Sequence, residues 1–372
     1  MQHRKPGYTH SCQCKHGPVH VLRKTSCGRE YTVLKVRRAN DTPVFPDREY
    51  DQPLAAWAGR DRILGQVVPA LTIILKTGGC AHDRCRMCSY RHERYGRLKH
   101  GELEAGLLAQ LAWIGNNFNL EDFDAVKIYT SGSLFDPLEM PVRARDTLAK
   151  MMRGKLVIAE TRPEYVTVDN LSHFVTLIDN GTHETPLFIA IGVETSNDTI
   201  REKCIDKGFS WDDFVKATAR ARSVGAGVKA YLLAKPLFLT EREAIDDMIS
   251  SIRDLSGMAD MISLNPCTVQ RNTELELYWK QGAYRPPYLW SILTILSESP
   301  VHLTCDPLGG GQERGPHNCG VCDSPLVKGI RDYSLTADRD LLSALLATSC
   351  SCKEEWEFVL QEERSYCMPL TR

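Results

Sequence analysis

Six apolar segments of strand length alternate with amphipathic segments between residues 55 and 267, and few folds accommodate such a repeat. The predicted strands are residues 70–75, 125–130, 155–160, 186–194, 227–234 and 260–266. The predicted helices are residues 101–116, 141–153, 168–180, 198–207, 211–224, 241–255 and 287–297. Strands and helices in strict alternation form parallel sheets with right-handed crossovers. We therefore predict an α/β fold whose functional groups follow the C-terminal ends of the strands.

The composition is that of a globular protein: of 372 residues, 42% are hydrophobic and 25% are charged. The longest nearly apolar run, residues 67–75, is far shorter than the roughly 20 residues that span a bilayer. The N-terminus is polar and basic and has no apolar stretch typical of a secretory signal. These features predict a cytoplasmic protein with no membrane partner.

The charge is distributed unevenly along the chain, although its net value is only -1. Residues 1–38 hold nine Lys and Arg side chains and one Glu, a charge of +8, which leaves -9 for the rest. We divide the chain into a basic N-terminal extension (1–52), an α/β domain (53–298) and a Cys-rich C-terminal extension with an acidic helical tail (299–372). A basic extension is typical of proteins that bind a polyanion such as tRNA, although a solvated tail has the same composition.

Three cysteines, Cys80, Cys85 and Cys88, directly follow the first predicted strand. In a chain without a secretory signal, cysteines are expected to be reduced and available for metal binding or catalysis. Closely spaced thiolates bind zinc or an iron–sulfur cluster. Three ligands instead of four favour a cubane cluster with one iron open to a small molecule, because structural zinc usually takes four protein ligands.

This cysteine loop, together with motifs that follow the later strands, resembles the radical S-adenosylmethionine (SAM) superfamily. The commonest pattern of that superfamily has three residues between the first two cysteines, whereas this chain has four. The resemblance implies a partial (βα)6 TIM-like barrel, a [4Fe–4S] cluster on the three cysteines and SAM as a second cofactor.

The resemblance also implies which residues contact SAM. Met87 would lie near the adenine, Glu194 would bind a ribose hydroxyl and Arg201 would pair with the methionine carboxylate, for which its planar fork is suited. The full set is Met87, Tyr90, Ser131, Gly132, Ser133, Glu160, Arg162, Glu194 and Arg201. Within it, the backbone of the glycine-containing stretch would receive the methionine amine.

Polar residues after the remaining strands are candidates for substrate contacts. They are Asp136, Lys235, Asn265, Gln270 and Arg271. Lys235 could meet a substrate anion or extend from the barrel rim into solvent. Gln270 and Arg271 could contact a base or a phosphate.

The C-terminal extension contains a second cysteine motif, in which Cys319 and Cys322 form a C-x2-C pair. With Cys305 and His317 the pair could make a four-ligand zinc site, although another residue could replace His317, which is only two residues from Cys319. A second cluster, or reduced cysteines in a glycine-rich loop, are the alternatives. At the N-terminus, a further metal site could be formed by Cys12, Cys14, His16 and Cys27.

Five segments extend the resemblance to one archaeal branch, the radical SAM proteins of archaeosine biosynthesis (the RaSEA family). They are residues 130–137, 160–164, 235–241, 265–272 and 315–323, within a matching region of about residues 55–335. The resemblance implies a lyase that converts the lysine adduct of 7-cyano-7-deazaguanine in tRNA to archaeosine by radical cleavage of a carbon–nitrogen bond. It also implies a partner, the lysine-transferase subunit of archaeosine synthase, and a one-electron donor.

Two alternatives stay open. One is another radical SAM enzyme that modifies RNA, either elongator-like or methylthiotransferase-like. The other is a non-catalytic, metal-stabilised subunit that binds tRNA. Basic residues around the cluster loop predict a positive rim that suits any of these RNA partners, and they are Arg84, Arg86, Arg91, Arg94, Arg97 and Lys99.

Overall fold

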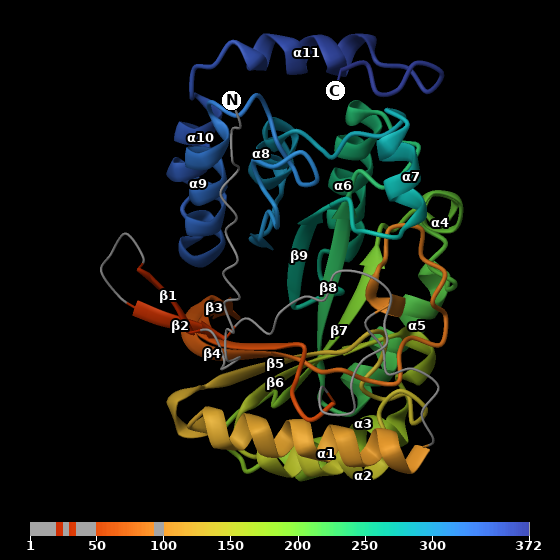
Figure 1. The fold of residues 1–372 in the computed structure, drawn as a ribbon, viewed down its shortest axis with the longest axis vertical. Helices are drawn as coiled ribbons and strands as arrows, with labels where there is room; N and C mark the ends of the chain where they lie inside the picture. The colour runs from red at the N-terminus through yellow and green to blue at the C-terminus, as the bar shows by residue number, and fades with distance from the viewer. Residues whose placement is uncertain (1–19, 25–29, 35–49, 93–99, 372) are drawn as a thin grey trace, which may run out of the picture.

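The computed structural model describes residues 20–24, 30–34, 50–92 and 100–371, and it contains one ten-stranded sheet whose strands follow chain order (Figure 1). The strands are β1 (His20–Lys24), β2 (Glu30–Leu34), β3 (Ala55–Ile63), β4 (Gln66–Ile74), β5 (Ala125–Tyr129), β6 (Leu156–Thr161), β7 (Leu187–Glu194), β8 (Gly227–Ala234), β9 (Met261–Pro266) and β10 (Leu303–Cys305). Strands β1 to β4 pair antiparallel, whereas β4 to β10 pair parallel. The six predicted strands are β4 to β9, so the predicted α/β fold is confirmed.

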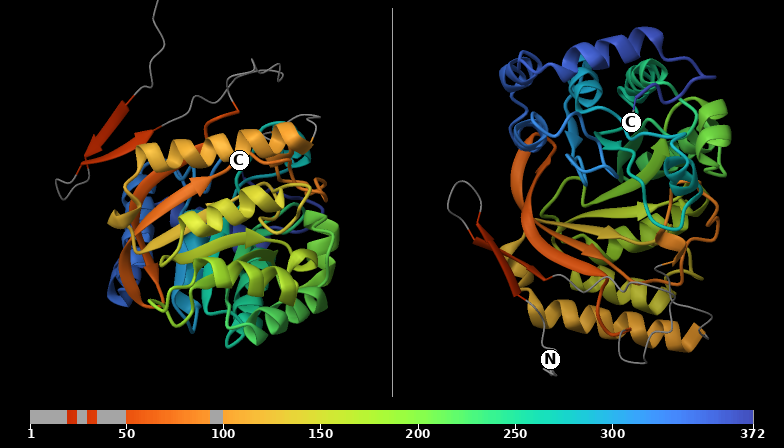
Figure 2. Two further views of the ribbon diagram at one scale, coloured as in Figure 1. Left: turned by 90° about the horizontal axis from the view of Figure 1, so that it is seen from below. Right: turned by 45° about the horizontal axis from the view of Figure 1, so that its top comes forward.

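The part of the sheet from β3 to β10 curves into a nearly closed barrel (Figure 2). Helix α9 bridges its two edges, because it contacts both β3 and β10. Arg62 on β3 donates a hydrogen bond to the carbonyl of Leu335 on α9 (3.0 Å). Neither edge strand is predicted from the sequence, since β3 carries a charged run toward its C-terminal end and β10 has only three residues.

Strands β3 and β4 are joined by a two-residue turn at Leu64 and Gly65. Both residues have positive φ (47° and 80°), and Ile63 pairs directly with Gln66 across the turn. A turn of this kind matches the right-handed twist of the two strands. Because the tight hairpin turns the chain from β3 directly into β4, β3 lies antiparallel to β4 and forms an antiparallel edge of the otherwise parallel barrel.

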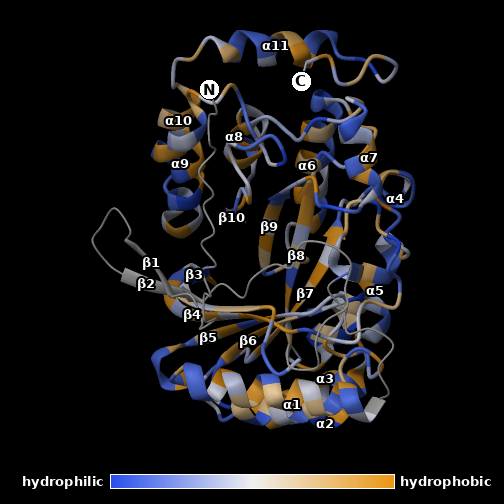
Figure 3. Ribbon diagram, viewed as in Figure 1, coloured by the Kyte–Doolittle hydropathy of each residue, from blue (hydrophilic) through white to orange (hydrophobic). Residues whose placement is uncertain are grey.

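Helices cover the outer face of the barrel, and Figure 3 shows that they carry both hydrophobic and hydrophilic residues, as expected when only one side is buried. The described helices are α1 (His100–Asn117), α2 (Val142–Met151), α3 (Val168–Ile178), α4 (Asp198–Ile200), α5 (Trp211–Ser223), α6 (Glu241–Leu255), α7 (Glu274–Lys280), α8 (Leu289–Glu298), α9 (Asp323–Thr336), α10 (Arg339–Leu346) and α11 (Cys352–Glu362), of which α10 and α11 pack on other helices. Short helical turns are η1 (Tyr90–His92), η2 (Leu120–Asp122) and η3 (Pro163–Tyr165), and η4 (Arg201–Ile205) is a π-helix.

The barrel interior is apolar toward the N-terminal ends of the parallel strands. The buried side chains of this layer are Ile63, Ala70, Ala125, Ile158, Phe188 and Ala190. Farther along the strands the interior becomes polar, and the hydroxyl groups of Tyr129 and Tyr231 lie 2.9 Å apart. Polar groups for chemistry are therefore concentrated toward the C-terminal ends of the strands, as predicted.

Most of the N-terminal extension, including Cys12, Cys14, His16 and Cys27, lies outside the described residues. Residues 303–305, which we assign to the C-terminal extension, form β10 and so belong to the sheet. Among the described helices, none is both long and apolar enough to cross a bilayer.

Candidate functional site

The cysteine loop follows β4 at the C-terminal end of the barrel. Cys85 is 8% exposed, and Cys80 and Cys88 are half-buried. Gly132, in the loop after β5, packs directly on Cys80: a Cβ at this glycine would lie 2.8 Å from Cys80 Cβ and Cys80 Sγ. The structure thus brings the first cysteine and the predicted SAM-binding loop into contact.

The segments that follow two other strands, β7 and β9, hold the cysteine loop in place. The Arg86 N–H donates to the carbonyl of Ile205 (2.9 Å), and the Arg86 guanidinium pairs with Glu274 (2.5 Å). The Ser89 N–H donates to the side chain of Gln270 (2.8 Å). The loop is therefore clamped between the segment after β7 and the segment after β9.

This clamp changes two predictions. Gln270, a candidate for base or phosphate contact, instead accepts a backbone hydrogen bond from the cysteine loop, and exposed Arg271 is its neighbour. Arg86, part of the predicted positive rim, is neutralised by Glu274, which also raises its pKa. Three other members of that rim, Arg94, Arg97 and Lys99, lie outside the described residues.

The three thiols fit an iron–sulfur cluster as donors. Burial raises the pKa of Cys88 to about 12, and the thiols of Cys85 and Cys80 add to the shift. A cluster would therefore bind with loss of the thiol protons. Among the described residues, the Sγ atoms of these three cysteines are not all within 4.8 Å of one another. A wider spacing is expected where each thiolate binds a different iron.

The glycine-containing loop after β5 surrounds a carboxylate of the chain itself. The backbone N–H groups of Ser131, Gly132 and Ser133 all donate to Glu139 (2.8, 2.9 and 2.7 Å), and the Thr77 hydroxyl also donates to it (2.8 Å). Consecutive amides that converge in this way form an anion-binding nest. The nest is filled by Glu139, which is 1% exposed and which the sequence analysis does not identify. The loop N–H groups thus serve an internal carboxylate, and an amine ligand, which is itself a donor, would need the carbonyl oxygens of the loop as acceptors.

Two predicted acidic residues lie at the ends of neighbouring strands. Glu160 on β6 accepts the Thr130 N–H (2.9 Å), and burial, with smaller effects from nearby carboxylates, raises its pKa to about 8. Glu194 at the end of β7 pairs with Lys207 (2.5 Å). A Cβ at Gly192 would lie 2.6 Å from the Glu194 carboxylate, so glycine is needed beside this pair.

Lys207 is a further residue of the site that the sequence analysis misses. Burial alone would lower its pKa, but Glu194 more than offsets this, so the pKa is raised and the amine stays charged. The carbonyl of Lys207 accepts both terminal nitrogens of Arg162 (3.2 Å each), and Arg162 also pairs with Glu164 (2.5 Å). Lys207 thus links the two predicted residues Glu194 and Arg162.

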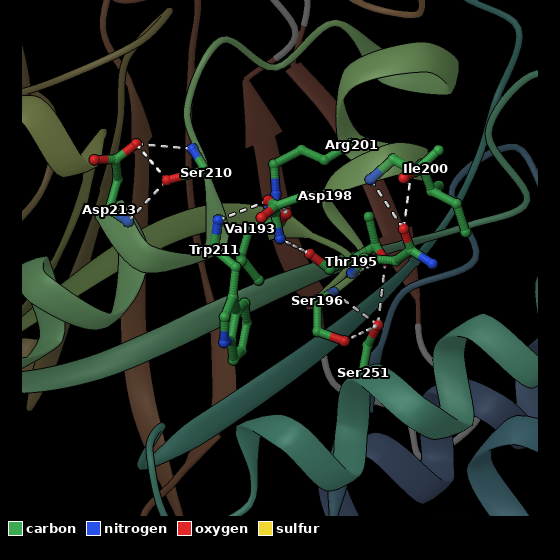
Figure 4. A network of polar contacts seen from close by, with 12 residues as sticks. Val193, Thr195, Ser196, Asp198, Ile200, Arg201, Ser210, Trp211, Asp213 and Ser251 are labelled. Atoms are coloured by element: carbon green, nitrogen blue, oxygen red, sulfur yellow. Dashed lines mark hydrogen bonds and ion pairs between the residues drawn. The ribbon is translucent and has the colours of Figure 1, made fainter.

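Arg201 does not have the geometry predicted for it. It is 1% exposed, and its guanidinium donates to the carbonyls of Val193 and Thr195 and pairs with Asp198 (Figure 4). A methionine carboxylate would have to displace these partners. Arg201 therefore acts in this structure as a positioning residue, which ties the end of β7 to the π-helix η4.

The π-helix replaces the central half of the predicted helix 198–207 and supports the cysteine loop. It is followed by Asp206, which has a left-handed backbone (φ 57°), and the Asp206 carbonyl lies 2.6 Å from the Nε2 atom of His82 in the cysteine loop. His82 packs against Gly208, where a side chain would collide with its ring. The unusual helix thus aims backbone carbonyls at the loop that carries the three cysteines.

Two of the predicted substrate residues are engaged inside the protein. Asp136 is 2% exposed, accepts the Leu138 N–H (2.9 Å) and binds the Tyr165 hydroxyl. Lys235 is 3% exposed and pairs with the fully buried Glu241 (2.5 Å). Lys235 is therefore neither free to meet a substrate anion nor extended into solvent. Asn265 is half-buried near the C-terminal end of β9.

The C-terminal cysteine group differs from the predicted set. Cys319 and Cys322 lie together with Cys350 and Cys352, and the four sulfurs are all within 4.8 Å of one another. Cys305 and His317, which the sequence analysis proposes as ligands, are not in this group. Cys305 is buried on β10, where its N–H binds Ser334, and His317 Nδ1 lies 2.8 Å from the carbonyl of Gly315.

Comparisons with known proteins identify relatives that match most of the chain. The chain is 39% identical over 351 residues to archaeosine synthase subunit beta of Methanosarcina acetivorans, covering 91% of this chain and 98% of the relative. It is 33% identical over 319 residues to archaeosine synthase subunit beta of Thermococcus kodakarensis, covering 82% and 96%. Among solved structures, an N-terminally truncated Elp3 of Methanocaldococcus infernus has a TM-score of 0.44 at 18% identity, covering 62% of this chain and 58% of that one. No family model matches the chain.

Proposed function

The chain belongs to the family of archaeosine synthase subunit beta, and from this premise we propose that it is a radical SAM lyase of archaeosine biosynthesis. Its substrate is tRNA in which 7-cyano-7-deazaguanine carries a lysine adduct, and its product is archaeosine. Besides family membership, the observation that supports this proposal is the contact of Cys80 with Gly132, which joins the cysteine loop to the predicted SAM loop.

The cofactors of this proposal are a [4Fe–4S] cluster held by Cys80, Cys85 and Cys88, and SAM. When bound together, they supply the one-electron chemistry that starts cleavage of the carbon–nitrogen bond. The carbonyl side of the loop containing Ser131 and Gly132 is the proposed position of the methionine amine, because an amine donates hydrogen bonds and the loop N–H groups, which donate to Glu139, cannot accept them.

The residues of the chain itself position these groups and exclude water. The Arg86–Glu274 pair and the Ser89–Gln270 hydrogen bond fix the cysteine loop. Lys207 holds the carboxylate of Glu194 at the end of β7, next to the proposed SAM site. Burial of the thiols limits access of solvent to the reactive centre.

The proposed partners are tRNA, a lysine-transferase subunit of archaeosine synthase and a one-electron donor, all in the cytoplasm. Residues 1–38, with a charge of +8, are the proposed contact with tRNA phosphates. The target base must leave its stack to reach the end of the barrel, which costs a few kcal/mol, and phosphate contacts would offset this cost.

The test is incubation of the anaerobically reconstituted full chain with lysine-adducted tRNA, SAM and a reductant, followed by mass analysis of the nucleosides. We expect archaeosine from the native chain and from Cys367→Ala, and none from Cys85→Ala. A brown protein that cleaves SAM but leaves the lysine adduct unchanged would indicate another radical SAM reaction. A colourless protein that binds tRNA would indicate the non-catalytic alternative.

A further inference from the structure

Four cysteines meet on the side of the molecule where α11 lies across α6 and α8 (Figure 1). Cys319 and Cys322 directly precede α9, whereas Cys350 and Cys352 directly precede or begin α11. The Sγ atoms of Cys319 and Cys350 are 3.6 Å apart, those of Cys322 and Cys352 are 3.6 Å apart, and those of Cys350 and Cys352 are 3.4 Å apart. Two chain segments thus contribute two sulfurs each to one compact group.

The spacing of the sulfurs fits a single ion. Four thiolates arranged tetrahedrally at the usual Zn–S distance of about 2.3 Å stand about 3.8 Å from one another. The ligands of a cubane cluster bind four different irons and stand farther apart. A disulfide needs sulfurs about 2.05 Å apart, and all four cysteines here are free.

Several groups around the sulfurs are donors suited to thiolates, and one acceptor, the Asp323 carboxylate, lies 3.7 Å from Cys322 Sγ. Cys319 Sγ accepts the backbone N–H groups of Val321 and Cys322. Cys322 Sγ accepts the side-chain amide of Asn318 (3.3 Å), and Cys352 Sγ accepts the indole N–H of Trp290 (3.4 Å). Donors of this kind orient metal ligands and spread the negative charge of the sulfurs.

We propose that Cys319, Cys322, Cys350 and Cys352 bind one structural zinc ion, which fastens α11 to the start of α9 and thereby supports the buried Lys235–Glu241 pair at the end of β8. All four coordination positions are taken by protein, so the site is structural and has no open position for a substrate. It is separate from the proposed iron–sulfur site, with which it shares no residue.

The support for the buried pair runs through α11. The indole N–H of Trp356 on α11 donates to the Ser291 hydroxyl (2.8 Å), which donates to Glu241 (2.6 Å). Glu363, directly after α11, accepts the backbone N–H of Glu241 (2.7 Å). If α11 came loose, the Glu241 backbone N–H would lose its acceptor Glu363, and Ser291, which donates to the Glu241 carboxylate, would lose its donor Trp356. A buried ion pair whose surrounding hydrogen bonds are weakened becomes costly.

Metal analysis of the anaerobically purified full chain tests the proposal directly. We expect one zinc per chain, retained in Cys85→Ala although iron is lost, and retained in the matched control Cys367→Ser. Cys350→Ser should lose the zinc while keeping the iron. Iron at the four cysteines, no metal at all, or full zinc retention in Cys350→Ser would each overturn the assignment. Because iron and zinc are measured separately, failure of the radical SAM proposal would not imitate failure of this one.

Two further measurements cover the case in which Cys350→Ser does not fold. Cobalt replacing zinc in the native chain should give the intense visible bands of a tetrahedral site with four sulfur ligands, and an octahedral cobalt spectrum would contradict the proposal. Release of the zinc by a mercurial reagent should accelerate hydrogen exchange in α11 and in the segment joining β8 to α6. Unchanged exchange in both regions would show that the ion does not support the Lys235–Glu241 pair.

Discussion

At the scale of single residues, the candidate site depends on close approaches that only glycine permits. Gly132 lies against Cys80, and Gly192 lies beside the Glu194–Lys207 pair. In both places a neighbouring functional group occupies the space of a Cβ. These glycines therefore determine how near the cysteine loop, the loop after β5 and the end of β7 lie to one another.

We expect Gly132→Ala to fold but to bind less iron and to lose most SAM cleavage, because the new methyl group would lie 2.8 Å from Cys80 Sγ. Iron content and SAM cleavage after anaerobic reconstitution measure this effect. The matched control is Gly101→Ala in α1, where no atom lies within 4 Å of the added methyl group. Equal iron content in the two variants would contradict this account of the site.

The raised pKa of Glu160 predicts that the free energy of unfolding depends on pH. Its pKa of about 8 in the folded protein exceeds the ordinary value of 4.5, so the folded state binds the proton more tightly than the unfolded state. Between these two values stability should fall as pH rises, by up to about 1.4 kcal/mol per pH unit from this group. In Glu160→Gln this part of the slope should disappear.

Urea denaturation at several pH values from about pH 5 to about pH 8 measures the slope. Glu164→Gln, a change at a more exposed carboxylate that pairs with Arg162, is the control and should keep the native slope. A Glu160→Gln variant with the same pH dependence as the native chain would show that Glu160 is not protonated in the folded state.

At the scale of elements, the segments after β7 and β9 act as two supports for the cysteine loop. The π-helix η4 presents the carbonyl of Ile205, and the segment before α7 presents the side chain of Gln270. Arg201 fixes the first support through the carbonyls at the end of β7. The cysteine loop has little regular structure of its own, so its conformation depends on these contacts.

The contacts that hold the cysteine loop predict different effects for substitutions at two neighbouring residues, Gln270 and Arg271. Gln270→Ala should reduce iron content or raise the KM for SAM several-fold while leaving tRNA affinity unchanged, because Gln270 binds the Ser89 N–H. Arg271→Ala, at an exposed neighbouring position, should weaken tRNA binding and leave iron content unchanged. Parallel measurements of iron, SAM kinetics and tRNA affinity distinguish the two, and reduced tRNA affinity alone in Gln270→Ala would restore its role as a substrate contact.

At the scale of the whole molecule, charge is separated along the chain. The first 38 residues carry +8 and the remainder carries -9, so the extension and the body differ in sign. Near the cysteine loop, Arg86 is neutralised by Glu274, which reduces the positive charge available there. The N-terminal extension therefore has a strong excess of positive charge, which is the reason we propose it as the contact with a polyanionic partner.

We expect tRNA affinity to fall steeply with salt, with a log–log slope of several units, because each phosphate contact releases a counterion. Removal of residues 1–38 should weaken binding and reduce this slope, and binding titrations at several salt concentrations measure both. Iron content and SAM cleavage of the shortened chain provide the control and should not change. A slope that is the same with and without the extension would exclude it as a phosphate contact.

Local sequence patterns alone were sufficient to locate β4 to β9, the cysteine loop and the loop that follows β5. These features depend on side chains a few residues apart, such as the apolar run before Cys80 or the spacing of Cys85 and Cys88. In a parallel sheet, the loops that follow the strands all lie at the same end of the sheet. The order of the motifs and the end of the barrel at which they lie therefore follow from the sequence by itself.

The partners of the buried charged groups were decided only by the tertiary structure. Arg201 meets backbone carbonyls, Lys235 meets Glu241, and Cys322 meets Cys352 thirty residues later. A charge or a thiol in a sequence shows which kinds of partner it could take. Which partner it has depends on where folding removes it from water, because a buried polar group must bind whatever group of matching chemistry lies beside it.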